Sequence, residues 1–523
     1  MARRLLTACF LSVLAPAFTL YASTWHVLAG ETYGDGSESW PFGTITEGLE
    51  AAQPGDTVLV AAGTYEEQVN PPRDGLFGAP VVLLGAAGNT EDRPLVYRSP
   101  ENDSYYLVDN YRKHFVIEGF ILDGGFGARD VVRIRGGDAD STVLRNCEIR
   151  NSMRDGIDIT GGDWILIENC KVHHHLAGTY DDQQDAHGIV ASEVRHLVIR
   201  NCEICYVTGD CFQADPDRST EPYWDDVLIE DCHLWTGPLP EDAALWKAGE
   251  IPGENAIDTK VEQEYSRYKD LERPLLVLRG IKAHGWARGY IGNRAAFNIK
   301  EKVECVLDRV EVYDCEIAYR LRGSLGGALV TITNSLVYGC EKAFRVEEHV
   351  KDVHVYNSTF GLEIGQFMER SPSAGIYTGM QIINCLFLAD EIPALPSMAL
   401  DSSNLAVTES SFADVSSHDY RLLPSSPAAW AGVPLAGVET DLAGDPRPVD
   451  SPSLGAYEVQ GGAGRKSCDI NGDGKKDISD VIKLLLLGRD NPMDPAADWN
   501  GDGEYSVSDA VSLLLSIIRG LCP

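Results

Sequence analysis

Apolar and polar residues alternate in short stretches along most of the chain, and the same kind of stretch keeps returning. Its third and fifth positions are mostly apolar, while its fourth and sixth are mostly polar or charged. This pattern predicts a strand with one face toward a core and one toward solvent. Where nothing is inserted, the stretches recur every 22 to 25 residues, a period with room for short strands and turns but not for helices. They are DVVRIR (130–135), DGIDIT (155–160), HGIVAS (187–192), DCFQAD (210–215), NAIDTK (255–260), AAFNIK (295–300), IAYRLR (317–322) and KAFRVE (342–347).

A second repeat lies between these stretches. Each copy predicts a strand, then an Asn or Asp that can adopt the left-handed conformation at a tight turn, then another strand. Repeats of this size cannot bury an apolar face alone, so we expect them to stack into a solenoid. The copies are VLRNCEI (143–149), LIENCKV (166–172), VIRNCEI (198–204) and LIEDCHL (228–234), with weaker ones at 332–337, 355–360 and 382–387.

These repeats resemble the right-handed parallel β-helix of the pectate lyase superfamily. The segment PFGTITEGLEAAQPGDTVLVAAGTY (41–65) is similar to the opening of such solenoids, with a short capping helix over 44–52. The segment GDPRPVDSPSLGAYE (444–458) is similar to their closing part. The resemblance implies an all-β, single-stranded parallel β-helix over residues 24–460, a fold that hosts many chemistries.

The cysteines follow the second repeat. Cys147, Cys170, Cys202 and Cys232 each come directly after the turn residue, which places them inward on successive coils. Parallel Cα–Cβ bonds on neighbouring strands make a poor disulfide geometry. We therefore expect buried free thiols at these positions rather than disulfide bonds.

The first 22 residues have the layout of a cleavable secretory signal: two arginines, an apolar run and small residues near its end. No later apolar run approaches the ~20 residues of a membrane span, so we expect a soluble, secreted monomer. The formal net charge of −35 argues against a nucleic acid as partner.

The outward fourth and sixth positions bring cations together within this acidic chain. Lys260, Lys300, Arg320 and Arg322 fall on three consecutive coils, and adjacent coils lie ~4.8 Å apart. Like charges on adjacent strands are destabilising, and the chain has carboxylates to spare as partners. The cluster therefore predicts an anionic polymer as ligand. The alternative is a solvated face on which charges are scattered at random.

Long inserts flank the coil that carries Asp258 and Lys260, at 235–253, 262–274 and 282–293. In the resembled superfamily, the polysaccharide cleft runs along one parallel sheet between such loops. Aromatic residues on loops are candidate stacking platforms for sugar rings, although some would simply pack the inserts onto the solenoid. The candidates for substrate binding are Trp235, Trp246, Tyr265 and Trp286, with Tyr268 and Tyr290 beside them.

These residues lead to the hypothesis of a polysaccharide lyase. Lys260 would abstract the proton beside a uronate carboxylate, and the chain would break by β-elimination. Like charge from Lys300 would favour the neutral amine that a base requires. Arg320 and Arg322 would neutralise the substrate carboxylate and stabilise the enolate-like intermediate.

The hypothesis is similar to the family-nine polysaccharide lyases, which use a lysine base beside a calcium ion held by aspartates. By that resemblance Asp258, with Asp215 or Asp158, would hold Ca²⁺ in the solenoid. The tight aspartate cluster of that family is not matched in this sequence.

Two other functions stay open. Asp158, Asp215 and Asp258 could supply the paired carboxylates of a glycoside hydrolase, as in the polygalacturonases, which share the solenoid. A non-catalytic, carbohydrate-binding solenoid is the third possibility, in which Asp258 and Lys260 form only a surface ion pair worth ~0–1 kcal/mol.

The C-terminus carries a different motif after a linker at 461–467. The loops DINGDGKKDISD (469–480) and DWNGDGEYSVSD (498–509) have the oxygen ligands and the glycine turn of a calcium loop, and an apolar helix is expected after each. Residues 468–523 thus resemble a type I dockerin, whose family role is to bind a cohesin domain, and Cys468 and Cys522 are predicted to clasp it. By resemblance the Ca²⁺ ligands are Asp469, Asn471, Asp473, Asp480, Asp498, Asn500, Asp502 and Asp509.

Overall fold

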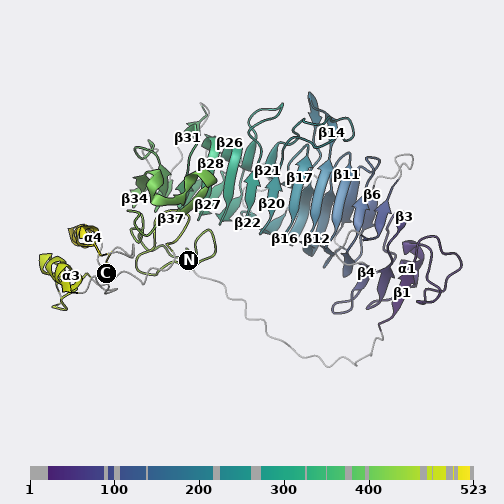
Figure 1. Cartoon of the computed structure of the whole chain (residues 1–523). Coiled ribbons are helices and arrows are strands. Elements are labelled where there is room, and N and C mark those ends of the chain that lie inside the picture. The colour runs from purple at the N-terminus through teal and green to yellow at the C-terminus, as the bar shows by residue number, and fades with distance from the viewer. Residues whose placement is uncertain are drawn as a thin grey trace.

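Three long parallel sheets wind around one core in the computed structural model (Figure 1). The structure describes residues 22–86, 92–98, 106–136, 139–215, 224–260, 272–323, 327–348, 350–371, 380–394, 400–459, 468–473, 475–490, 499 and 505–518. Each coil from β4 to β31 contributes one strand to each sheet before the chain enters the next coil, whereas the first and last coils have no strand in the sheet called sheet 1 below. The predicted all-β parallel solenoid is therefore confirmed, while the predicted signal (except residue 22) and the linker lie outside the described residues.

Sheet 1 contains the repeat that begins with DVVRIR, and it carries the candidate site. Its strands are β6 (Tyr106–Asn110), β9 (Asp130–Arg135), the first parts of β12 (Ile157–Glu168) and β16 (Ile189–Arg200), β18 (Phe212–Ala214), β21 (Asn255–Thr259), β24 (Ala295–Ile299), the last parts of β26 (Glu311–Arg322) and β28 (Leu336–Glu347), and β31 (Gln366–Arg370).

Sheets 2 and 3 complete each coil. Sheet 2 has β1 (Thr24–Val27), β2 (Thr57–Val60), β4 (Val81–Gly85), β7 (Phe115–Glu118), β10 (Val143–Arg145), the last parts of β12 and β16, β19 (Asp225–Glu230), β22 (Leu275–Arg279), β25 (Glu304–Asp308), β27 (Leu329–Thr333), β29 (Asp352–Tyr356), β32 (Gln381–Ile383) and β34 (Leu400–Ser402). Sheet 3 has β3 (Thr64–Glu66), β5 (Leu95–Tyr97), β8 (Ile121–Asp123), β11 (Glu148–Ser152), β13 (Lys171–His175), β17 (Glu203–Val207), β20 (His233–Trp235), β23 (Lys282–His284), the first parts of β26 and β28, β30 (Thr359–Phe360), β33 (Leu386–Leu388) and β35 (Leu405–Val407).

The core follows the predicted alternation. The third positions of sheet 1 point inward and form a stack in which the rings of Phe297 and Tyr319 have centroids 5.6 Å apart, and those of Tyr319 and Phe344 5.2 Å apart. All three side chains are fully buried. Offset aromatic stacking adds to the stabilisation that burial itself provides.

The turn between sheets 2 and 3 also follows the prediction. Asn146, Asn169, Asn201 and Asp231 all have φ between 52° and 55°, the left-handed conformation that Asn and Asp adopt at low cost. The next coil has Gly280 at this turn, with φ 64°. A side chain there would collide with the carboxylate of Asp231, because the added Cβ would lie 2.2 Å from its Oδ1.

A helix covers the first coil of the solenoid. It is α1 (Ile45–Ala51), which packs against β1 and β2, lies within the predicted capping helix over 44–52 and starts with a capping box between Thr44 and Glu47. Near the other end, the antiparallel strands β36 (Phe412–Asp414) and β37 (Asp419–Leu422), with two single-turn 3₁₀ helices, form an apolar cluster with the outward residues Leu336 and Tyr338 of β28. Arg447 lies beside the same coils: it is buried, pairs with Glu458 and donates to Asn334 Oδ1.

Ten cysteines of the solenoid are free and buried. Cys147, Cys170, Cys202 and Cys232 stack on successive coils, and the backbone N–H of Cys202 donates to the sulfur of Cys232. This confirms the prediction of free thiols at the stacked positions.

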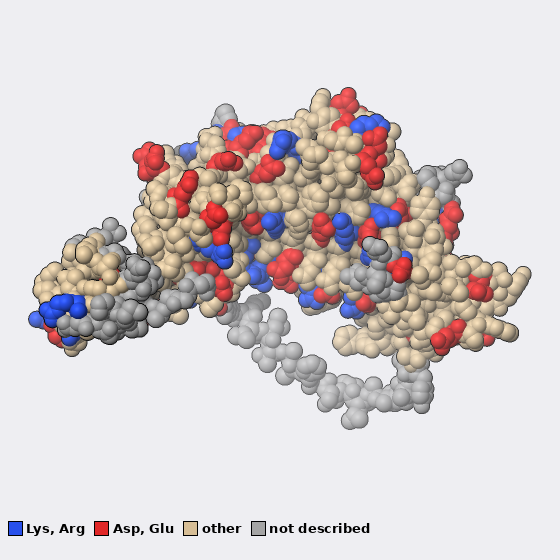
Figure 2. All heavy atoms as spheres, in the orientation of Figure 1, with Lys and Arg blue, Asp and Glu red and all other residues tan. Residues whose placement is uncertain are grey.

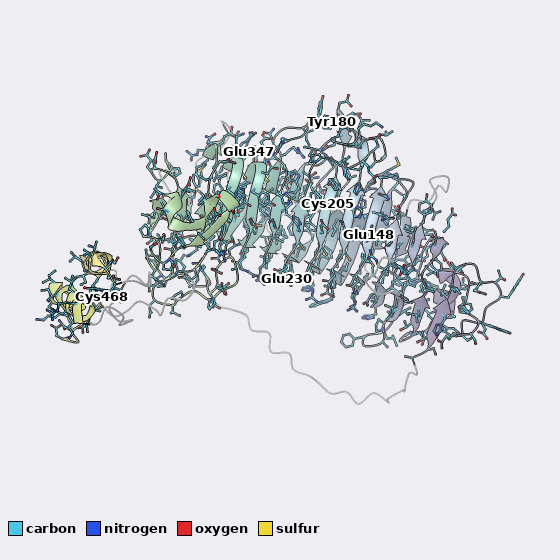
Figure 3. The ribbon with its side chains drawn as sticks, in the orientation of Figure 1. Glu148, Tyr180, Cys205, Glu230, Glu347 and Cys468 are labelled. Atoms are coloured by element: carbon cyan, nitrogen blue, oxygen red, sulfur yellow. The ribbon has the colours of Figure 1, made fainter. Side chains whose placement is uncertain are left out.

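The C-terminal part contains the two expected helices, α3 (Ile478–Asp490) and α4 (Val507–Ile518), which contact each other. Cys468 lies beside them (Figure 3) and is disulfide-bonded, whereas its predicted partner Cys522 lies outside the described residues. Asp498, Asn500 and Asp502 also lie outside them. Within the described residues, no helix has both the length and the apolar character to cross a membrane.

The buried thiol stack predicts a specific labelling result. Under non-reducing conditions a thiol reagent should modify almost none of the ten solenoid cysteines in the native protein, because each is buried, and all ten in denaturant. Mass mapping after each reaction measures this. Fewer than ten labelled solenoid cysteines in denaturant would show that some of them are disulfide-bonded.

Candidate functional site

The outward positions of sheet 1 form two columns that run along the solenoid, as the alignment of repeats predicts. In the fourth-position column, Gln213 pairs with Asp258, Asp258 with Asn298, and Asn298 with Arg320. Lys260, Lys300 and Arg322 occupy the sixth position on the corresponding coils. The strip formed by these residues is called the sheet 1 strip below.

Asp258 is outward but not solvated. It is only 3 % exposed, because neighbouring side chains close over it. Lys300 Nζ lies 2.9 Å from Asp258 Oδ2, and the amide of Asn298 donates to Oδ1 at 3.0 Å. Burial raises the pKa of Asp258 above its ordinary value, and the charge and hydrogen bond of Lys300 oppose that rise. The expectation of a solvent-facing fourth position is wrong here.

Lys260 has a different environment. Its Nζ donates to the side-chain carbonyl of Gln213 at 2.6 Å, and its backbone carbonyl accepts from the buried indole of Trp224 at 2.9 Å. The side chain is partly exposed at the end of β21. Among the described residues its hydrogen-bond partner is thus an uncharged amide, not the adjacent Asp258, which pairs with Lys300.

Arg320 and Arg322, which the sequence predicted to bind an anionic substrate, already pair with a carboxylate of the protein. Arg320 Nε and Arg322 Nε lie 3.2 and 3.1 Å from the carboxylate oxygens of Glu347, which stands in the next coil. Arg345 Nε lies 2.7 Å from the same carboxylate. Burial alone would raise the pKa of Glu347, but these guanidinium groups together hold it below its ordinary value. The assumption that the cations lack carboxylate partners is therefore wrong for Arg320, Arg322 and Lys300.

Ion pairs of this kind cover the rest of the surface as well. Figure 2 shows Lys and Arg side chains interleaved with Asp and Glu along the middle of the displayed face. On sheet 3, Lys171 lies 3.3 Å from Glu203, and Lys282 lies 3.6 Å from Glu311. These lysines, like the arginines of sheet 1, thus have a carboxylate partner in the adjacent coil.

Asp158 and Asp258, one of the two proposed pairs of calcium ligands in the solenoid, are not brought together. Val190 and Gln213 stand between Asp158 and Asp258 in the column, which separates the two by three coil steps, ~14 Å. Asp158 instead lies 3.6 Å from Arg133. In the part of the chain that the structure describes, no three His, Cys, Asp or Glu side chains gather closely enough to hold a metal ion.

Two of the predicted sugar platforms are structural. Trp246 is fully buried under its own insert, against Leu176 and Leu239, and Trp286 is 1 % exposed within the main core. Neither can stack on a sugar, so both predictions are wrong. The inserts fold onto each other through Tyr180, labelled at the top of Figure 3, whose ring lies 6.0 Å from Trp246 and 5.5 Å from Tyr290.

The remaining aromatic candidates differ among themselves. Trp235 stands on β20 within a ring stack of sheet 3, with centroids 4.7 Å from Tyr206 and 6.0 Å from His284. Its faces are thus taken by neighbours. Tyr290 is 58 % exposed and stays available for a ligand. Tyr265 and Tyr268 lie outside the described residues.

A polar ladder beneath the strip escaped the sequence interpretation. Asp130, Asp155, His187, Asp210 and Asn255 occupy the first position of five consecutive sheet 1 repeats. Asp155 N–H donates to Asp130 Oδ1 at 3.2 Å, His187 N–H to Asp155 Oδ1 at 2.9 Å, and Asp210 N–H to His187 Nδ1 at 2.9 Å. Asn255 then donates its amide to Asp210 at 2.7 Å. The signal was present, since D, D, H, D and N begin the repeats in that order.

The ladder stacks acids at close range in a buried place. Burial raises the pKa of Asp130 to about 6. Burial and the charge of Asp130 raise the pKa of Asp155 to about 8. For His187, burial and then the charges of Lys260 and Arg154 lower the pKa to about 3, so its imidazole is neutral and Nδ1 can accept a hydrogen bond. The ladder therefore carries fewer charges at neutral pH than its sequence suggests.

Glu254, outside the ladder, was also not predicted from the sequence as a site residue. It immediately precedes β21, and burial, followed by the charges of Asp185 and Asp258, raises its pKa above the ordinary value. Lys260 and Lys300 oppose the rise. Two carboxyl groups with raised pKa values thus flank the two amines of the strip.

Comparisons with known proteins agree with the architecture. A family model described as "Right handed beta helix region" matches residues 115–235, and a model of a protein of unknown function, DUF1565, matches residues 28–71. No curated protein matches the chain. Among solved structures the chain is similar to the pectate lyase Pel9A, at 14 % identity and a TM-score of 0.46, covering 84 % of this chain and 97 % of that one.

Two further similar structures are, by their titles, a lyase and a hydrolase. A rhamnogalacturonan lyase is 14 % identical with a TM-score of 0.41, covering 83 % of this chain and 96 % of the other. An endo-xylogalacturonan hydrolase from Aspergillus tubingensis is 11 % identical with a TM-score of 0.38, covering 73 % and 99 %. Likenesses this distant concern the fold alone.

The ladder predicts a pH-dependent stability. An acid whose pKa rises on folding, as that of Asp155 does from ~3.9, stabilises the folded state fully at low pH and loses this contribution as pH rises through about 8. Asp155→Asn keeps the acceptor oxygen for His187 N–H but cannot ionise. Between pH 5 and 9, the melting temperature of the variant should therefore fall by roughly 2–5 °C less than that of the wild type.

Thermal melts across this pH range measure the effect. Asp390→Asn, which removes an exposed carboxylate, is the matched control and should follow the wild type. Parallel curves for the wild type and Asp155→Asn would contradict the prediction.

Proposed function

We propose that the solenoid degrades a uronate-containing polysaccharide as a lyase, with Lys260 as the base. The observation that carries the proposal is the contrast between two neighbouring lysines. Lys300 is fixed to Asp258 by an ion pair of 2.9 Å, whereas Lys260 donates to the uncharged amide of Gln213. The amine of Lys260 is thus held by a neutral acceptor and partly exposed on the strip, where a substrate can reach it.

The chemistry needs few groups. The neutral amine of Lys260 removes the proton from the carbon beside the uronate carboxylate, a carbon–carbon double bond forms, the glycosidic C–O bond at the β carbon breaks, and the departing sugar oxygen takes a proton from water. Once Lys260 holds the proton, its ammonium group and that of Lys300 stand against the single carboxylate of Asp258, which leaves positive charge for the enolate-like intermediate. Arg322, one coil further in the same column, extends this charge, although Glu347 and Glu348 already bind it.

A glycoside hydrolase is the second candidate, because the register keeps one carboxylate pair at a suitable distance. Asp215 stands two positions beyond Gln213, the residue that pairs with Asp258, so the two aspartates are diagonal neighbours. The backbone positions of such neighbours lie about 7–8 Å apart, and the two carboxyl groups of inverting hydrolases are ~6.5–9.5 Å apart. Asp158 lies too far from Asp258 for this role. The products decide, since a lyase leaves an unsaturated uronate that absorbs ultraviolet light.

The C-terminal helices complete the proposal as a dockerin that binds a cohesin domain in a calcium-dependent manner. The first loop suits Ca²⁺ in its donor chemistry. Asp480 is fully buried and accepts hydrogen bonds from the N–H groups of Ile470 and Asn471 on Oδ1 and of Asp477 on Oδ2. Asp469 accepts from two N–H groups of the same loop. With its signal segment removed, the exported protein would be held on a cohesin-bearing partner near its polymer.

Removal of Lys260 tests the lyase. Lys260→Ala should lower the rate of unsaturated-uronate formation by a factor of ~10²–10⁴, because a general base is lost. Arg322→Ala should mainly raise KM, since Arg322 only supplies charge. The matched control is Lys282→Ala, which removes a lysine from sheet 3 and should leave the rate unchanged.

The measurement is absorbance at 235 nm with polygalacturonate, alginate and chondroitin sulfate. Near-normal activity of Lys260→Ala would exclude it as the base. Reducing ends without the chromophore would favour the hydrolase, and Asp215→Asn and Asp258→Asn would then be the variants to measure.

Calcium removal tests the C-terminal part. Chelation should reduce the helical circular dichroism at 222 nm of the full chain while the β signal persists, because bound metal contributes directly to the folding of such small modules. Calcium should restore the signal in the wild type and not in the double variant Asp480→Asn, Asp509→Asn. A helical signal that chelation leaves unchanged would contradict the prediction.

A further inference from the structure

Trp164 is an exposed aromatic residue in an unusual place. It lies within β12 at the corner between sheets 1 and 2, where the turn imposes φ of 62°. The same corner holds Ser141 in the preceding coil and His196 and Asp226 in the two that follow, all with φ between 52° and 60°. Small polar residues meet this requirement at low cost, whereas a bulky one is an outlier. The coil nevertheless has a tryptophan there, and 63 % of it is exposed.

Among the described residues, one ring stacks on the indole of Trp164, and it does so from one side. The imidazole of His196 stacks on the indole with centroids 4.0 Å apart and planes 22° apart. Asp226 Oδ2 lies 2.5 Å from His196 Nδ1 and so fixes the imidazole against the indole. One face of Trp164 is covered by this support, so its large exposure comes from the other face and the edges. A rigid, flat apolar face is thus presented to solvent.

The position of this face matters because it lies beside the sheet 1 strip. Thr160, four residues before Trp164, pairs with Ser192 in the next coil. The same column continues through Asp215 to Lys260, since Ala191 pairs with Ala214 and Ala214 with Thr259. Trp164 therefore lies three coils, ~14 Å along the solenoid axis, from the coil of Lys260 and at the same end of the sheet 1 strands.

We propose that Trp164 is a remote binding subsite that stacks on a pyranose ring of the polysaccharide, while another unit of the same chain lies at Lys260. The inference rests on the proposed function for its ligand and adds a second contact to it. The apolar C–H face of a sugar ring matches the open indole face in shape and chemistry. A polymer that runs parallel to the solenoid axis reaches both places without bending, whereas a short oligosaccharide at Lys260 does not reach Trp164.

Affinity electrophoresis of the full chain tests the subsite, with polygalacturonate, alginate and chondroitin sulfate as the probes. For any of these polymers that retards the wild type in the gel, Trp164→Ala should weaken binding roughly 2- to 10-fold, the equivalent of one lost aromatic stacking contact. His196→Ala should cause part of that loss because the indole loses its support. Trp40→Ala is the matched control: Trp40 is 69 % exposed in the turn before α1, and its removal should change nothing.

Chain length provides the second readout. A disaccharide or trisaccharide from the same polymer should bind the wild type and Trp164→Ala equally, and only longer chains should distinguish them. Equal affinities of Trp164→Ala and the wild type for the polymer would overturn the subsite, as would a wild type that binds none of the three probes. Loss of binding in Trp164→Ala without unsaturated products from the wild type would overturn the lyase and leave the subsite standing.

Discussion

The register between coils is the constraint on which every other feature of this molecule depends. Parallel hydrogen bonding places each residue beside its counterpart in the next coil, for example Ile157 beside Val132 and Ile189. Each side chain therefore lies ~4.8 Å from the side chains at the equivalent positions of the two adjacent coils. Columns of Phe, Tyr, Cys or Asn satisfy this condition by stacking or by hydrogen bonds. A buried column of acids does not: burial raises the pKa of both Asp130 and Asp155, and the charge of Asp130 adds to the rise at Asp155.

Much of this architecture could be predicted from the sequence because it is periodic. The repeat length, the inward positions, the left-handed turn at Asn146 and its successors, the free thiols and the capping helix all depend on local pattern. They need only the assumption that equivalent positions stack. The columns of the site could be predicted for the same reason, and Lys260, Lys300 and Arg322 do fall in one of them.

What could not be predicted depends on how far side chains reach. The alignment of repeats places Arg322 beside Glu347. It does not predict that Arg320 and Arg345 also pair with the carboxylate of Glu347. The burial of Trp246 and Trp286 depends on contacts between inserts that have no period. The polar ladder was visible as the first letter of each repeat. The alternation of apolar and polar residues is clear only at positions three to six, so it gives no orientation for the first residue of each repeat.

The candidate site illustrates how a strongly acidic protein can attract an anion. Net charge acts at long range and is screened beyond about 8–10 Å in physiological salt, so a bound polymer senses mainly the groups that it touches. Around Lys260 these are two amines and the carboxyl of Asp258. Burial also raises the pKa of the nearby carboxyl group of Glu254.

The helix on the first coil has a consequence for association between molecules. A parallel solenoid ends in unpaired strand edges, and each edge would accept the coil of another copy in the same register that joins its own coils. Helix α1 covers the first coil with structure that is not a parallel strand. Head-to-tail growth needs an open edge on both partners, so this one helix is enough to keep the array finite.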